Sequence, residues 1–196
     1  MRKGIQAFSA VLITGVMLGV VGSVYFWGLP LIEKNRDIAT LENSERFAHE
    51  LNDKIKYIAN HGGRDRLQIS VPGTVIFDNR SNSVRLAINT KGSIYVPGLI
   101  SLSRNSCTMT RGIWGTDEPS SLCVETKQVD TVMEHDYRLT FITLDTPGIL
   151  SYRIELIGGN ATGSEQRSII IESAGSATTT ASGRDVTRTF VRIGIE

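Results

Sequence analysis

The first 32 residues constrain this chain more than any other part of it. Arg2 and Lys3 precede an uncharged stretch, Ile5–Ile32, and the next charged residue is Glu33. A helix rises about 1.5 Å per residue, so the stretch is longer than the roughly 20 residues that cross a bilayer. We expect a short basic tail over residues 1–4 and a transmembrane helix over residues 5–32. A cleaved secretory signal is the alternative, which the length of the stretch disfavours.

The flanks of this stretch predict its orientation in the membrane. The basic tail favours a cytoplasmic N-terminus, and the aromatic run Tyr25–Trp27 suits the outer interface. Pro30 follows, where we expect a break or a bend in the helix. The sequence therefore predicts a single-pass protein of the cell membrane, in contact with lipid, with the part after residue 63 outside the cell.

Small residues inside the stretch bear on helix packing. Gly15 and Gly19 form a GxxxG pair, and Gly22 lies about one turn further on. This spacing lets a second helix approach closely in lipid. The alternative is that glycine is simply common in membrane helices.

Residues 33–63 read as an amphipathic helix or stalk that ends at Gly62-Gly63. Its apolar positions follow a spacing of three and four residues, with Ser44 in register: Leu41, Ala48, Leu51, Ile55 and Ile58. Such a stripe must be buried, either against the chain's own globular part or against the same helix in neighbouring subunits.

From residue 64 to residue 196 the periodicity changes to that of strands. Seven to nine short strands separated by turn residues predict an antiparallel β-sandwich, so the fold class is α+β. Tyr137–Leu144 and Ile149–Ile157 flank Thr146-Pro147-Gly148 and predict a hairpin. The Ser-, Thr- and Gly-rich stretch 173–183 is expected to form a hairpin tip or a loop. The expected strands are Leu67–Val71, Thr74–Phe77, Ser83–Ile88, Ile94–Val96, Leu99–Leu102, Tyr137–Leu144, Ile149–Ile157, Ser168–Ile171 and Thr187–Ile195.

Two cysteines and two glycosylation sequons are features expected of an exported domain. Cys107 and Cys123 predict one disulfide, with two free thiols as the alternative. Asn79 and Asn160 begin glycosylation sequons in polar, turn-like stretches.

We find no constellation of catalytic residues. The net charge is +1 without a basic patch, which argues against nucleic acid as a partner. His135 is expected in a polar turn before a strand, and Asp117 and Glu118 in a solvated turn. Trp114 is either a surface contact or a plug of the sandwich. We therefore expect no enzyme activity, no metal site and no cofactor.

The order of the parts resembles the archaeal type IV pilin superfamily, which includes archaellins and membrane-anchored accessory proteins of pili and archaella. The resemblance rests on Arg2-Lys3-Gly4 followed by Ile5-Gln6, the uncharged helix, its amphipathic continuation and the β-rich head. Ser9 stands where bacterial-type pilins carry a glutamate, which favours the archaeal branch.

The resemblance implies processing and assembly. A peptidase would cut after Gly4, so that Ile5 becomes the new N-terminus. The freed helices would pack through Gly15 and Gly19 into a filament core. Residues Leu41, Leu51 and Ile55 would continue that seam, and the heads would face outward.

Two further functions stay open beside this one. The first is a monomeric, membrane-tethered β-sandwich that binds a surface-layer protein or a glycan. The second is an anchored subunit of an exported enzyme complex. An intact N-terminus and a stripe buried in the chain's own domain are expected for the tethered module, whereas trimming and an exposed stripe are expected for the filament subunit.

Overall fold

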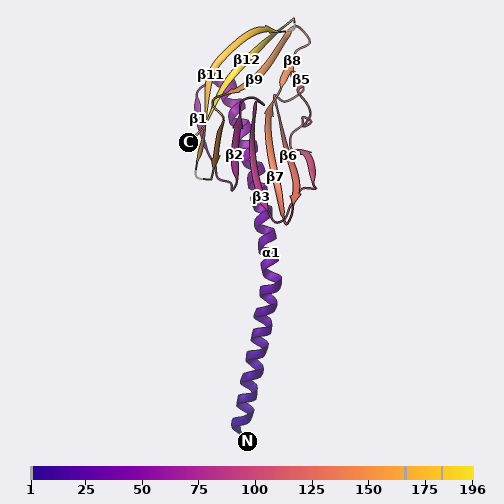
Figure 1. The fold of residues 1–196 in the computed structure, drawn as a ribbon, viewed down its shortest axis with the longest axis vertical. Coiled ribbons are helices and arrows are strands. Elements are labelled where there is room, and N and C mark those ends of the chain that lie inside the picture. Colours follow the sequence, from indigo (N-terminus) through magenta and orange to yellow (C-terminus); the bar gives the residue numbers. More distant parts are fainter. Residues whose placement is uncertain (1, 166, 182) are drawn as a thin grey trace.

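The computed structural model describes residues 2–165, 167–181 and 183–196, with side chains described outside 2–10 and 181. One helix, α1 (Arg2–His61), leads into a head built of two sheets (Figure 1). The helix is unbroken through Pro30, so the predicted break is wrong. A proline inside a helix removes one backbone hydrogen bond, and the turns on either side keep theirs.

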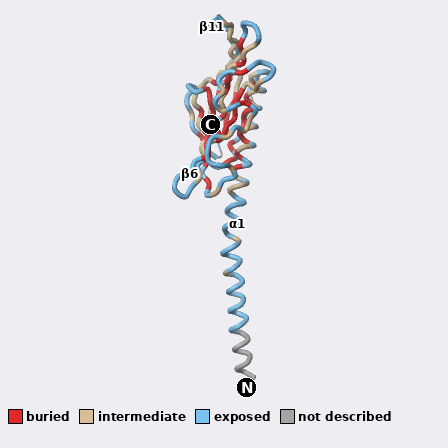
Figure 2. Tube along the Cα trace, turned by 90° about the vertical axis from the view of Figure 1, so that its right-hand side faces the viewer, coloured by how far each residue is buried: buried red, intermediate tan, exposed pale blue. Residues whose placement is uncertain are grey.

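The helix divides into an exposed half and a packed half (Figure 2). Residues 11–36 are exposed, apart from the half-buried Gly22 and Gly28. From Leu41 onward one side of the helix lies inside the head. The predicted stripe is confirmed: Leu41, Ser44, Ala48, Leu51, Ile55 and Ile58 are all buried.

The head holds two six-stranded sheets within the described residues. Sheet A has the order β1-β11-β12-β9-β8-β5, and sheet B the order β10-β2-β3-β7-β6-β4. The strands are β1 (Arg64–Gln68), β2 (Thr74–Asp78), β3 (Ser83–Thr90), β4 (Gly98–Ser101), β5 (Arg111–Ile113), β6 (Ser120–Val129), β7 (Val132–Phe141), β8 (Thr143–Asp145), β9 (Leu150–Ile157), β10 (Ala161–Ser164), β11 (Ser168–Ala181) and β12 (Arg184–Ile195).

The packed half of α1 joins the two sheets into one core. Its Phe47, Leu51 and Ile55 belong to the same buried cluster as residues of both sheets. Burying a large aliphatic side chain is worth about 1.5–3 kcal/mol, so this face of α1 adds substantially to the stability of the head. The expectation that Leu41, Leu51 and Ile55 form a seam between subunits is therefore wrong, because the chain's own sheets cover them.

The α+β class is confirmed, and the sheets are mostly antiparallel. Two pairs depart from the predicted pattern, because β9 runs parallel to β12 and β5 parallel to β8. The predicted strand Tyr137–Leu144 is divided at Ile142 into β7 and β8, which belong to different sheets. The hairpin around Pro147 is confirmed, but only β8 pairs with β9 there.

Other departures concern the number and the extent of the strands. The predicted strand Ile94–Val96 is a loop, and the sequence did not indicate β5, β6 or β10. The stretch 173–183 lies mostly within the long hairpin of β11 and β12, with a register shift between Ser173 and Ser176. Threonine and small residues suit an exposed ribbon, because neither face there needs an apolar core.

Candidate functional site

The exposed half of α1 is an apolar surface that the described part of the head does not cover. Its segment 11–32 carries large side chains that are mostly open, such as Phe26 at 81% and Trp27 at 84% exposure. At about 1.5 Å per residue this half is long enough to cross a membrane, and its composition is apolar enough. Water is a poor solvent for such a surface, and exposed apolar surfaces of this size are typical of sites that contact membranes or other proteins.

Gly15, Gly19 and Gly22 lie along one side of this exposed half. Apart from each glycine's neighbours in the chain and the nearby backbone of α1, no described atom lies within 4 Å of a Cβ atom placed at any of the three. Ser23 Oγ donates a hydrogen bond to the Gly19 carbonyl at 2.9 Å, which satisfies the hydroxyl within the helix. The predicted packing residues therefore form an open side of the helix, and glycines at this spacing are the kind that allow close approach of a second helix in lipid.

Gly4 and Ile5, the predicted processing residues, lie in α1 within the stretch 2–10 whose side chains fall outside the described ones. The backbone of this stretch is helical.

The base of the head meets α1 just beyond the uncharged stretch. Lys91 Nζ lies 2.9 Å from Glu33 Oε1, and the Gly92 amide donates to Asp37 Oδ2 at 2.7 Å. Tyr95 Oη donates to Glu45 Oε2 at 2.7 Å, and burial raises the pKa of Tyr95. These contacts place the 91–95 loop level with the first charges after the apolar segment.

Exposed apolar side chains cluster at this base. Val96, directly after the 91–95 loop, is 74% exposed. Val129 and Val132, the strand residues on either side of the β6–β7 turn, are 51% and 37% exposed. The turn lies beside Thr90, the last residue of β3, because Thr90 pairs with Met133. The end of the head nearest the apolar helix thus also presents exposed apolar side chains.

A cleft of about 420 Å³ lies between the end of α1 and sheet A. Trp114, which is 52% exposed, packs on Tyr152 with ring centroids 4.4 Å apart. Lys56, Asn60 and Asp117 add polar groups to the lining. Trp114 therefore lies at the surface of the head and does not plug the sandwich.

The two glycosylation sequons come together in the fold. Asn79 and Asn160 are exposed, and the Asn79 amide donates to Asn160 Oδ1 at 3.3 Å. Asn79 Nδ2, the atom to which a glycan would attach, donates to the Gly158 carbonyl at 3.1 Å. The sequence offered no signal for this meeting of the β2–β3 turn with the β9–β10 loop.

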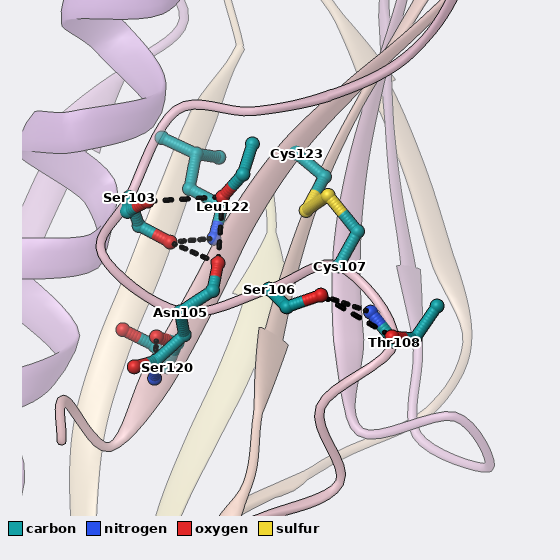
Figure 3. The surroundings of a disulfide bond; sticks show 9 residues. Ser103, Asn105, Ser106, Cys107, Thr108, Ser120, Leu122 and Cys123 are labelled. Atoms are coloured by element: carbon teal, nitrogen blue, oxygen red, sulfur yellow. Dashed lines mark hydrogen bonds between the residues drawn. A yellow bond between two sulfur atoms is a disulfide. The ribbon is translucent and has the colours of Figure 1, made fainter.

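The disulfide is present and closes a loop along β6 (Figure 3). Cys107 and Cys123 are bonded with Cα atoms 5.9 Å apart. The buried Asn105 holds the loop, because its Nδ2 donates to the carbonyls of Glu118 at 2.7 Å and Ser120 at 2.8 Å. Ser120 Oγ in turn donates to Asn52 Oδ1 of α1 at 2.7 Å. The covalent loop is thereby tied to the helix.

Removing this bridge is expected to destabilise the head. The two cysteines are 16 positions apart, and closing a loop of about this length stabilises a fold by roughly 3 kcal/mol in the chain-entropy model. Replacement of both cysteines by serine should lower the free energy of unfolding by that order. Thiol labelling of the denatured, unreduced wild-type chain should find no thiol, and reduction should release two. Two labelled cysteines before reduction would contradict the bridge.

The histidine and the acidic residues noted in the sequence do not come together in one site. His135 is not in a turn but inside β7 and fully buried, between Thr90 Oγ1 at 2.9 Å and Thr126 Oγ1 at 3.1 Å. Burial lowers its pKa, which favours the neutral ring. Glu134 and Asp136 lie on the opposite face, because side chains alternate along a strand.

The two acids before Pro119 are engaged in local structure. Asp117 Oδ2 accepts from the Ile113 amide at 2.7 Å and so closes the turn after β5. Glu118 Oε2 lies 3.9 Å from Lys56 Nζ of α1. Among the described residues no group of three or more His, Cys, Asp or Glu side chains is arranged to hold a metal ion.

Comparison with known proteins adds no assignment. No family model, no curated protein and no solved structure matches this chain. The functional interpretation therefore depends on the chain's own surfaces.

Proposed function

We propose that this chain is a membrane-anchored protein of the cell surface, a pilin-like subunit or accessory component of an archaeal type IV pilus or archaellum-type filament. The observation that carries the proposal is the exposed, apolar half of α1 over residues 11–32. One half is bare and apolar, whereas the other half is built into the core of the head. A helix of this kind has one surface that suits lipid before assembly and other helices afterwards.

The base of the head supports the membrane anchor. Glu33 and Asp37 fix the 91–95 loop at the point where the apolar segment ends. If residues 5–32 lie in the bilayer, Val96, Val129 and Val132 face its headgroup layer. The head then stands outside the membrane with the N-terminus in the cytoplasm, as the basic tail favours.

Trimming after Gly4 is part of the proposal. Arg2 and Lys3 hold the tail at the cytoplasmic face, and each charge costs several kcal/mol at the centre of a bilayer. A cut that leaves Ile5 as the first residue removes both charges. The remaining helix is then free to move from lipid into a filament core.

A second function is favoured by the cleft of Trp114 and Tyr152. Exposed aromatic rings beside a few polar groups are typical of small-molecule sites. A membrane-tethered module that binds a glycan or a surface-layer protein would use this cleft. The burial of the α1 stripe in the chain's own head is the arrangement expected for that module, and it leaves residues 11–32 as the surface for any assembly.

One experiment separates the two functions. Mass spectrometry of the protein from native membranes, together with electron microscopy of material sheared from the cells, tests trimming and assembly. The filament subunit should begin at Ile5 and appear in sheared filaments. A chain that keeps Met1 or Arg2 and sediments as a monomer in mild detergent would contradict the filament subunit and favour the tethered module.

A further inference from the structure

Four arginines gather on the outer face of sheet A, at the edge that β5 forms. They line a hollow of about 390 Å³ together with Thr143, Asp145 and Val186: Arg111, Arg153, Arg184 and Arg188. Three of the four lie in one row across the sheet. Arg111 pairs with Thr143, Thr143 with Arg153, and Arg153 with Arg188. Neighbouring strands are about 4.8 Å apart, so the row presents its side chains side by side.

Three of the four arginines form ion pairs with nearby carboxylates. Arg111 binds Asp145 through two hydrogen bonds of 2.9 and 2.8 Å, and these chiefly lower the pKa of that carboxyl to about 2. Arg184 Nη1 lies 3.6 Å from Asp145 Oδ1, which is ion-pair distance but too long for a hydrogen bond. Arg188 Nη1 lies 3.3 Å from Glu155 Oε2. Arg153 has no carboxylate partner among the described residues.

Three side-chain nitrogens of these arginines are buried without a hydrogen-bond acceptor among the described residues. Arg153 Nε, Arg188 Nε and Arg184 Nη1 are buried and have no acceptor within the described chain. Buried polar groups are nearly always hydrogen-bonded, and an unmatched donor calls for an explanation such as an ion. Like charges directly opposite each other on neighbouring strands also destabilise a sheet unless something balances them. Arg153 and Arg188 are such a pair.

We propose that this hollow binds a sulfate or phosphate group, with Arg153 as its central ligand and Arg188 and Arg111 at its sides. A guanidinium presents a planar fork of donors that matches the oxygens of such a group. Four cations against Asp145 and Glu155 leave an excess of positive charge for a divalent anion. The group is either a free ion or a sulfate ester on a saccharide. The sequence shows no such patch, because the four arginines come from three separate strands.

The test is a calorimetric titration of the full-length protein in detergent with sodium sulfate and, separately, with sodium phosphate. Sodium chloride keeps the ionic strength constant throughout. Saturable binding of sulfate or phosphate by the wild type is expected. R153Q should weaken it at least tenfold. R192Q is the matched control, because Arg192 lies on β12 four residues beyond Arg188, is exposed and does not line the hollow. R192Q removes one positive charge, as R153Q does, and should change the affinity for sulfate or phosphate less than twofold.

A second variant and a second ligand complete the experiment. R188Q should weaken binding as R153Q does, so a folding defect in one variant does not leave the proposal undecided. A sulfated disaccharide that binds more tightly than inorganic sulfate would identify a saccharide as the carrier, and equal affinities would identify the free ion. No saturable binding by the wild type, or equal losses in R153Q and R192Q, would overturn the proposal.

Discussion

Replacing Asn82 by glycine is expected to destabilise the head by roughly 3–5 kcal/mol, since it leaves three buried backbone groups without a partner. Asn82 is buried in the β2–β3 turn. Its Nδ2 donates to the carbonyls of Phe141 at 3.2 Å and Ile154 at 2.9 Å, and its Oδ1 accepts from the Leu156 amide at 2.6 Å. This one side chain therefore ties β7 of sheet B to β9 of sheet A.

Glycine is chosen because of the backbone at this position. Asn82 has a φ of 50°, where a side chain other than Asn or Asp adds strain of its own. Glycine removes the three hydrogen bonds without adding that strain. Asp130 has a φ of 53° in the exposed β6–β7 turn, so D130G is the matched control, and it should change stability by less than about 0.5 kcal/mol. Chemical denaturation of both variants is the measurement, and equal stabilities would contradict the role of Asn82.

Replacing Gly15 and Gly19 together by leucine should abolish assembly while leaving the head folded. In the proposed filament these glycines let a neighbouring helix approach, and two leucines would hold it away. Beyond the neighbouring backbone of α1, no described atom lies within 4 Å of the new Cβ atoms. The head should therefore keep its disulfide and its melting temperature. Electron microscopy of sheared material and thermal unfolding in detergent measure the two effects.

The control for this variant is on the other side of the helix. Met17 lies about 160° from both Gly15 and Gly19 at 100° per residue, and it is 65% exposed. M17W adds comparable bulk there and should leave assembly intact if the glycine side is the contact. Filaments of normal yield from the double leucine variant, or equal loss in M17W, would contradict packing through the glycines.

Local patterns in the sequence predicted much of this protein. The uncharged stretch, the amphipathic stripe of α1 and the hairpin around Pro147 each depend on neighbours within a few turns or one reversal. A helix buries whichever side is apolar, so Leu41 to Ile58 were recognisable as core before their partner was known. Cys107 and Cys123 were recognisable as a pair because the chain holds two cysteines.

Only the tertiary structure decided what those elements face. The stripe of α1 had two possible partners, and the sheets of the same chain cover it, since both sheets supply apolar side chains to one core. His135 reads as polar between two acids, yet the register of β7 with β3 and β6 places it between two threonines. The arginine hollow depends on parallel and antiparallel pairings between β5, β8, β9 and β12, and long-range pairing of this kind leaves no periodic mark on a sequence. Sequence by itself therefore determined the long apolar helix and the periodic elements, and the pairing of distant strands decided which side chains meet.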